Sequence, residues 1–275
     1  MNIIESIIIA IVEGITEYIP ISSTGHMIIT EKLLGVEETD FVKVFTVAIQ
    51  LGAILSVLVL YRKKFFDFKN INFYLKLAIG VIPAMVLGLL FSKKIDALLN
   101  SSTTVAIALL LGGIVLIFID KVFTQNEIHN EKEISFIKAF IIGCWQCLAM
   151  VPGVSRSAAS IIGGMQQKLT RYAAAEFSFF LAVPTMLAAS GYKLFKYYRQ
   201  NGGFSSNELQ LLAIGNIVAF IVALLAIKFF IGFLQKHGFK VWGIYRIILG
   251  ILLLALIYKG YLPAWLLKKH CFWTI

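Results

Sequence analysis

Long apolar runs recur along this 275-residue chain, and polar residues gather in the shorter stretches between them. At about 1.5 Å per residue in a helix, each run is long enough to cross about 30 Å of hydrocarbon. The pattern therefore predicts an all-α polytopic membrane protein with about six transmembrane helices. The six runs are Phe41–Tyr61, Phe73–Phe91, Thr103–Ile119, Tyr172–Tyr192, Leu209–Phe233 and Trp242–Tyr258.

The composition agrees with this class. Hydrophobic residues make up 59% of the chain and charged residues 15%, with a mean hydropathy of +0.85, which is far more apolar than a typical soluble domain. The net charge of +10 is explained by basic loops that face anionic lipid headgroups, with attraction of an anionic substrate as the alternative. We expect no nucleic-acid partner. Because Lys and Arg are almost evenly divided between the two sets of loops, the positive-inside rule does not give the orientation.

The order of apolar and polar segments repeats once within the chain. A shift of about 132 residues superposes the spans of the first half on those of the second. Each half then contains one polar-interrupted segment followed by three spans. Because three is odd, the second half must enter the membrane with the opposite orientation. We therefore expect a single membrane domain, 1–275, built from two inverted repeats, 1–133 and 134–275.

The two interrupted segments, Asn2–Leu34 and Ile134–Leu169, are broken by Pro20 and by Pro152–Gly153. Proline removes an amide donor and clashes with the preceding helical turn, so each segment should form helix, break and helix. Irregular backbone is tolerated at membrane depth only when it is buried in protein or lines a watery cavity. We expect two re-entrant hairpins that meet near the midplane, with a continuous kinked span as the alternative.

The first interrupted segment carries two carboxylates in the stretch EGITEYIPISSTGH. Glu13 and Glu17 are four residues apart and share one helical face, so their charges repel unless a cation, a proton or an arginine lies between them. Hard oxygen ligands suit Mg²⁺ or Ca²⁺ that bridges a phosphate, which makes both residues candidate metal ligands. A wet helix end that carries two solvated acids is the alternative.

Hydroxyl residues follow the break in the first segment. Ser22, Ser23, Thr24 and Gly25 open the second helix, where free amides and the positive end of the helix dipole form a candidate phosphate site. His26 is three residues beyond Ser23 on the same helical face, within reach of a hydrogen bond that would activate a nucleophile. Simple helix capping accounts for one of these hydroxyls but not for three.

The second interrupted segment contains the stretch QCLAMVPGVSRSAAS. Ser155, Arg156 and Ser157 follow its break and precede a helix of small residues. The planar guanidinium of arginine matches phosphate oxygens and stays charged at cellular pH, so Arg156 is the best candidate to hold a phosphate. A structural ion pair of Arg156 with Glu13 or Glu17 is the alternative.

These two stretches resemble the two signature motifs of the bacterial undecaprenyl-diphosphate phosphatase family, the integral-membrane type associated with bacitracin resistance. The resemblance extends over nearly the whole chain, including FTVAIQLG at Phe45–Gly52 and RYAAAEFSFFLAVP at Arg171–Pro184. It implies hydrolysis of undecaprenyl diphosphate to undecaprenyl phosphate and inorganic phosphate, which recycles the lipid carrier for peptidoglycan synthesis. It also implies a location in the bacterial plasma membrane, an active site open to the outer face, other prenyl diphosphates as further substrates, and a homodimer as one option.

The resemblance assigns roles to the residues of both motifs. It makes Ser23 the nucleophile with His26 beside it, Glu13 and Glu17 the acidic pair, and Arg156, flanked by Ser155 and Ser157, the phosphate-binding group. The residues alone leave the choice between Ser23 and His26 as the attacking group open. The family commonly has Gly and Thr where this chain has Ala158 and Ser160.

Two other classes of function compete with this interpretation. A second class of membrane phosphatase requires a histidine followed four residues later by aspartate, and His129, His237 and His270 are not followed in that way. Inverted repeats with broken helices are also typical of secondary transporters, so a lipid-phosphate flippase without hydrolysis is the alternative. A transporter would need the arginine and the helix ends but would have no use for a nucleophile next to a base.

Overall fold

A computed structural model describes residues 1–99 and 101–261, with the backbone alone for 92–99. These residues form helices and connecting turns, and their only β-type pairing is an isolated bridge between Ile128 and Leu169. The helices, in chain order, are α1 (Ile3–Thr16), α2 (Ser23–Leu34), α3 (Asp40–Ala48), α4 (Gln50–Leu60), α5 (Arg62–Phe65), α6 (Ile71–Leu99), α7 (Ser102–Val122), η1 (Glu131–Glu133), α8 (Phe136–Gln146), η2 (Cys147–Met150), α9 (Arg156–Gln166), α10 (Arg171–Asn201), α11 (Ser206–His237) and α12 (Lys240–Tyr258).

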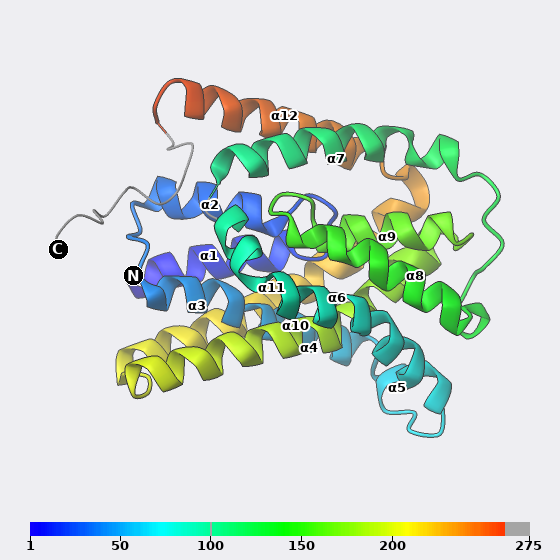
Figure 1. Cartoon of the computed structure of the whole chain (residues 1–275), viewed down its shortest axis with the longest axis horizontal. Coiled ribbons are helices and arrows are strands. Elements are labelled where there is room, and N and C mark those ends of the chain that lie inside the picture. Colours follow the sequence, from blue (N-terminus) through cyan, green and yellow to red (C-terminus); the bar gives the residue numbers. More distant parts are fainter. Residues whose placement is uncertain (100, 262–275) are drawn as a thin grey trace.

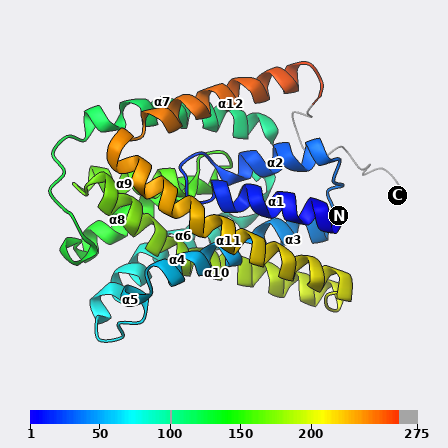
Figure 2. The same cartoon turned by 180° about the vertical axis from the view of Figure 1, so that it is seen from behind.

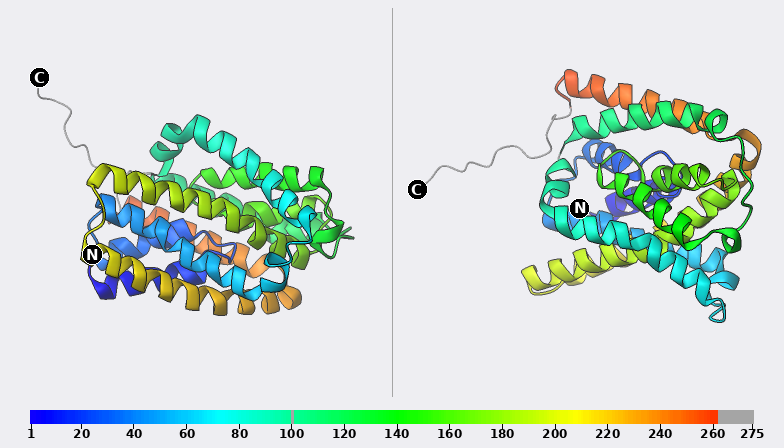
Figure 3. Two further views of the ribbon diagram at one scale, coloured as in Figure 1. Left: turned by 90° about the horizontal axis from the view of Figure 1, so that it is seen from below. Right: turned by 45° about the vertical axis from the view of Figure 1, so that its right-hand side comes forward.

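The six predicted spans are confirmed. Six stretches of the described chain are long and apolar enough to cross a membrane, namely Asp40–Leu60, Ile71–Phe91, Ser102–Val122, Arg171–Asn201, Ser206–His237 and Lys240–Tyr258. They run roughly along a common direction (Figure 3). The first span differs from the prediction of one continuous helix, because a turn at Ile49 divides it into α3 and α4. The amide of Gly52, which follows this turn, donates to Asn216 Oδ1 of α11 at 2.7 Å.

Both interrupted segments break where proline predicts. Helix α1 ends at Thr16 and α2 begins at Ser23, on either side of Pro20, whereas α8 and η2 precede the break at Pro152–Gly153 and α9 follows it. Helix α2 runs back beside α1, as seen from both sides of the molecule (Figures 1 and 2). Each of these helices has 14 residues or fewer, too few to cross about 30 Å of hydrocarbon. The depth of the hairpins in a bilayer remains a prediction.

Close glycine contacts pack the helices from the two halves of the chain together. Gly113 of α7 and Gly243 of α12 face each other, and a Cβ on either glycine would lie within 2.8 Å of the carbonyl oxygen of the other. Helices α7 and α12 therefore lie side by side along one edge of the molecule (Figures 1 and 2). This mutual contact accords with a two-fold relation between the halves, while the inverted repeat itself remains a prediction.

The first half of α10 is the centre of the core. Phe177, Phe179 and Phe180 are fully or almost fully buried there. Tyr18, from the break between α1 and α2, packs edge-on against Phe179 with 5.1 Å between ring centroids. Helix α9 also packs against α10. The breaks of both hairpins are thus brought to one helix in the interior of the protein.

A separate polar cluster of Lys64, Lys76, Glu131 and Glu176 connects helices at one end of the molecule. Lys64 Nζ lies 2.6 Å from Glu131 Oε2 and 2.9 Å from Glu176 Oε2. Lys64 is between two spans, where burial opposes its charge, but its hydrogen bonds to both carboxylates outweigh burial and raise the pKa of its ammonium group. Lys76 Nζ donates to the carbonyl oxygen of Glu131 at 2.8 Å. These contacts attach the η1 segment to α5, α6 and α10.

Candidate active site

The two polar stretches meet through one buried ion pair. Arg156 Nη2, in the first turn of α9, lies 2.9 Å from Glu17 Oε1, which directly follows α1. The other carboxylate oxygen of Glu17 accepts a 2.7 Å hydrogen bond from Ser23 Oγ at the start of α2. A hydroxyl, a carboxylate and a guanidinium are thereby connected in that order. The ion pair expected as an alternative role for Arg156 is therefore present, and Glu17 is its partner.

The Arg156 side chain is held on several sides. Its Nη1 donates to the carbonyl oxygen of Ser178 at 3.0 Å and to Ser178 Oγ at 3.3 Å. Its Cζ lies 5.5 Å from the centroid of the Tyr18 ring, within the range of a cation–π interaction. Met186 Sδ makes a weaker contact with Nη2 at 3.6 Å. Since α10 supplies Ser178 and Met186, the central helix fixes the plane of the guanidinium.

The serines that begin α2 and α9 share an unusual backbone conformation. Ser22 has φ of 71° and Ser155 has φ of 73°, and of the described non-glycine residues only Lys168 also has positive φ. Ser155 Oγ caps its helix by accepting from the Ala158 amide, whereas Ser22 makes no side-chain cap and its Oγ is buried without a partner. Thr24 and Gly25 lie in the first turn of α2, as predicted. The two helix starts thus share a backbone conformation, although only α9 has a side-chain cap.

The expected hydrogen bond between Ser23 and His26 is not present. His26 Nδ1 lies 2.8 Å from the carbonyl oxygen of Ser22, and its Nε2 lies 2.7 Å from Tyr245 Oη of α12. A carbonyl oxygen only accepts, so Nδ1 carries the proton and Nε2 accepts from the tyrosine hydroxyl in a neutral ring. Ser23 and His26 both lie in α2, as predicted, but the His26 ring contacts Tyr245 of α12. Glu17, not His26, accepts the hydrogen bond from the Ser23 hydroxyl.

Ser157 and Ser160 tie the second break to its surroundings. Ser157 Oγ donates to the carbonyl oxygen of Ile19 in the first break at 3.2 Å and lies 3.0 Å from Ser155 Oγ. Ser160 Oγ donates to the carbonyl oxygen of Arg156 at 2.8 Å and lies 2.7 Å from Ser178 Oγ. The hydroxyl at position 160 thus takes part in hydrogen bonds, and Ala158 is buried.

Buried polar atoms without hydrogen-bond partners concentrate in these stretches. Within the described part of the chain, seven side-chain nitrogen or oxygen atoms are buried and unpartnered. Five of them belong to the two polar stretches, namely Glu13 Oε1, Tyr18 Oη, Ser22 Oγ, Gln146 Oε1 and Arg156 Nε. Leaving such atoms unpaired costs free energy, so their concentration in the two polar stretches indicates a site for a polar ligand.

The acidic pair suits a hard cation only together with ligand oxygens. Glu13 is buried with one oxygen unpartnered, and a buried carboxyl group needs a proton or a cation. Both oxygens of Glu17 already contact Arg156 and Ser23. Across the described residues, no three His, Cys, Asp or Glu side chains form a cluster that could hold a metal alone. Oxygens from a phosphate ligand would have to complete the coordination of Mg²⁺ or Ca²⁺.

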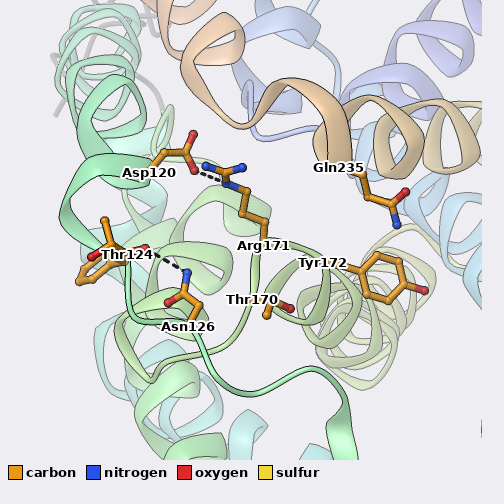
Figure 4. A pocket seen from close by; sticks show the side chains of 8 residues that line it. Asp120, Thr124, Asn126, Thr170, Arg171, Tyr172 and Gln235 are labelled. Atoms are coloured by element: carbon orange, nitrogen blue, oxygen red, sulfur yellow. Dashed lines mark hydrogen bonds and ion pairs between the residues drawn. The ribbon is translucent and has the colours of Figure 1, made fainter.

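Two pockets lie outside this network. A polar pocket of about 450 Å³ is located at the ends of α7, α10 and α11, where Arg171 Nε donates to Asp120 Oδ1 at 2.6 Å (Figure 4). None of the predicted site residues lines it. An apolar pocket of about 410 Å³ lies between α7, α8, η2 and α9, and Leu111, Trp145, Ala158 and Ile162 are among its lining residues. The second pocket borders the helix that carries Arg156.

The sequence did not identify three residues that contact the site or its breaks. Tyr18 and Ser178 contact Arg156, and Arg246 contacts both breaks. Tyr18 and Ser178 lie in apolar surroundings and carry no charge that would distinguish them. Arg246 is different, because it is an arginine within the predicted span Trp242–Tyr258. A charged residue within a transmembrane segment is rare and usually functional, and that signal could have identified it.

Comparisons with known proteins agree on one family. A family model described as "Bacitracin resistance protein BacA" matches residues 6–252. An undecaprenyl-diphosphatase from Flavobacterium psychrophilum is 60% identical over 256 residues, covering 93% of this chain and 96% of that protein. Similar proteins with the same name include one from Porphyromonas gingivalis, 53% identical over 94% of this chain and 98% of that protein, and one from Bdellovibrio bacteriovorus, 45% identical over 95% and 98%.

The Glu17–Arg156 ion pair predicts a non-additive effect on stability. Replacement of Arg156 by Met should lower the free energy of unfolding by about 3–5 kcal/mol, because it leaves a buried carboxylate without its partner. The double variant Glu17→Gln with Arg156→Met should recover much of this loss. Thermal unfolding in detergent micelles measures these two variants and Glu17→Gln alone. A double variant that loses the sum of the two single losses would show that the pair does not interact.

Proposed function

Because the chain belongs to the bacitracin resistance protein BacA family, we propose that it hydrolyses undecaprenyl diphosphate to undecaprenyl phosphate and inorganic phosphate. The substrate is inferred from the names of the similar proteins. The observation that carries the proposal is the connected series of Ser23, Glu17 and Arg156, drawn from both hairpins. The reaction would return the lipid carrier to peptidoglycan synthesis.

Ser23 is the proposed nucleophile and Glu17 its base. The Ser23 hydroxyl donates to Glu17 at 2.7 Å, so the carboxylate can take the proton as Oγ attacks the terminal phosphorus. The new bond joins Oγ to phosphorus, the bridging P–O bond breaks, and the prenyl phosphate leaves. Water then attacks the phosphorus and the P–Oγ bond breaks; Glu17 returns its proton to Ser23 Oγ, and the water oxygen leaves with its protons as part of inorganic phosphate.

Arg156 would bind the transferred phosphoryl group. Its Nε is buried and unpartnered. Its ion pair is with Glu17, the same carboxylate that accepts the hydrogen bond from Ser23. A guanidinium stabilises the negative charge on the equatorial oxygens during phosphoryl transfer. The amides at the start of α2, together with Ser22, Thr24 and Gly25, supply further donors for the diphosphate. His26 would orient this helix start through its bond to the Ser22 carbonyl.

A divalent cation is part of the proposal. Mg²⁺ or Ca²⁺ held by Glu13, Glu17 and diphosphate oxygens would neutralise charge that a single arginine cannot balance. The unpartnered Glu13 oxygen supports this assignment. Glu13 would be the main protein ligand of the ion, because both oxygens of Glu17 already contact Arg156 and Ser23.

The lipid tail needs an apolar surface beside the phosphate site. The pocket of about 410 Å³ that Ala158 and Ile162 help to line is one such surface, and we assign to it the first isoprene units of undecaprenyl diphosphate and of other prenyl diphosphates. The chain is a multi-pass membrane protein. We further propose that it lies in the bacterial plasma membrane with its site open to the outer face. The homodimer remains a prediction.

A lipid-phosphate flippase is not favoured. Transport would account for the broken helices and for Arg156, but not for a serine hydroxyl that donates to a buried carboxylate. Hydrolysis accounts for both features.

Phosphate release tests the proposal directly. Purified protein with a C15 or C55 prenyl diphosphate should release inorganic phosphate, and Ser23→Ala should abolish release while the affinity for substrate stays within about tenfold, because only the attacking atom is lost. Ser56→Ala is the matched control, since Ser56 is a fully buried serine of α4 whose hydroxyl donates to the carbonyl oxygen of Ala53. Near-normal turnover in Ser23→Ala would move the nucleophile to Ser22 or His26.

Chelation tests the cation. Treatment with EDTA should stop turnover, and addition of Mg²⁺ or Ca²⁺ should restore it. Glu13→Gln should raise the cation concentration needed for half-maximal activity by about 10–100-fold, the effect typical of a lost contribution to metal binding. Full turnover in the presence of the chelator would eliminate the cation and leave Glu17 as a proton acceptor alone.

A further inference from the structure

Arg246 is buried in α12 with an exposed fraction of 0%. No carboxylate of the described residues forms an ion pair with it, and all its partners are backbone carbonyl oxygens. Arginine has five N–H donors, and Arg246 makes five such hydrogen bonds. The acceptors are the carbonyl oxygens of Leu109 from Nε at 3.4 Å, Pro20 and Val154 from Nη1 at 3.2 and 3.0 Å, and Ala108 and Gly153 from Nη2 at 3.1 and 2.9 Å.

These acceptors connect three separate parts of the chain. Pro20 lies in the break of the first hairpin, Gly153 and Val154 lie in the break of the second, and Ala108 and Leu109 belong to α7. Carbonyl groups in a buried break lie outside the regular hydrogen bonding of a helix and need donors from elsewhere. One guanidinium supplies donors to both breaks at once.

The strained serines lie next to these acceptors. Ser22 follows Pro20 by two residues and Ser155 directly follows Val154, and both have positive φ. A non-glycine residue in such a conformation costs about 1–3 kcal/mol and persists only where its surroundings fix it. The neighbours of these two serines, Ser23 and Arg156, are the proposed nucleophile and phosphate-binding residue.

We propose that Arg246 is the positioning residue of the active site: it fixes the two breaks to each other and to α7, and so sets the position of Ser23 relative to Arg156. This inference rests on the proposed function for its kinetic consequences. Arg246 borders the apolar pocket, but it is fully buried and its five donors are in use. It therefore acts through the backbone and does not bind the phosphate.

Gly112 offers a mild way to displace Arg246. A Cβ at Gly112 would lie 2.2 Å from Arg246 Nη2, the far end of a flexible side chain that can move without shifting α7. Gly250→Ala is the matched control. Its Cβ would meet Leu110 Cγ at 2.8 Å and the carbonyl oxygen of Ala106 at 3.0 Å, again between α7 and α12, and Arg246 is not among its three nearest contacts.

Hydrogen exchange tests the contact independently of catalysis. In Arg246→Lys, which offers three donors where arginine offers five, and in Gly112→Ala, amides of residues 17–23 and 150–157 should exchange at least about tenfold faster than in the wild type. Both breaks should change together, although they are far apart in sequence. Gly250→Ala should leave their exchange within about threefold of the wild type. Faster exchange in one break alone, or in neither, would overturn the proposal.

Steady-state kinetics test the positioning role. Both Arg246→Lys and Gly112→Ala should lower kcat by about 10²-fold, the effect of a misplacement of about 1 Å between reacting groups, with KM within about threefold. Gly250→Ala should keep its kcat. A raised KM with unchanged kcat would make Arg246 a binding residue, and a normal kcat per folded molecule would reduce it to a purely structural role; either result contradicts the proposal. If the wild type releases no phosphate, the proposed function fails and the exchange experiment still decides whether Arg246 joins the breaks.

Discussion

Irregular backbone inside an apolar protein must find its hydrogen-bond partners elsewhere in the chain, and this requirement organises the structure around the two breaks. Pro20 and Pro152–Gly153 interrupt two short helical hairpins. The breaks then meet in the interior, where Ser157 donates to the carbonyl oxygen of Ile19 and Arg246 donates to both. Ile19, Pro20, Pro152 and Gly153 of this junction are buried in the protein, and the close contact of α7 with α12 brings Arg246 to it.

The junction also brings together buried groups of opposite charge, Glu17 and Arg156. Two carboxylates and one guanidinium are buried together, which would be costly for any of them alone. Arg156 and Glu17 satisfy each other, whereas Glu13 and Arg156 Nε retain unpartnered atoms. A diphosphate with a divalent cation would supply both missing partners. The unpartnered atoms of Glu13 and Arg156 therefore accord with the proposed substrate and cation.

The sequence predicts the spans and the breaks because these depend on local properties. Apolar length defines a span, and proline defines an interruption, so both are visible without the fold. Contacts between the halves depend on packing. Ser23 and His26 share helix α2 as predicted, but the expected hydrogen bond between them is absent, because the His26 ring contacts Tyr245 and the Ser22 carbonyl oxygen. The carbonyl acceptors of Arg246 could likewise not be predicted, because every residue carries a backbone carbonyl group and only the fold decides which of them meet the arginine.

A double-mutant cycle on turnover tests the central claim that the two hairpins form one catalytic site. The variants are Ser23→Ala from the first hairpin, Arg156→Lys from the second, and their combination, assayed for phosphate release at high enzyme concentration. Arg156→Lys keeps the charge but loses the planar fork, and kcat/KM should fall by about 10²-fold. Residues that act on one transition state are non-additive, so the double variant should lose little beyond Ser23→Ala alone. Losses that multiply independently would contradict a shared site.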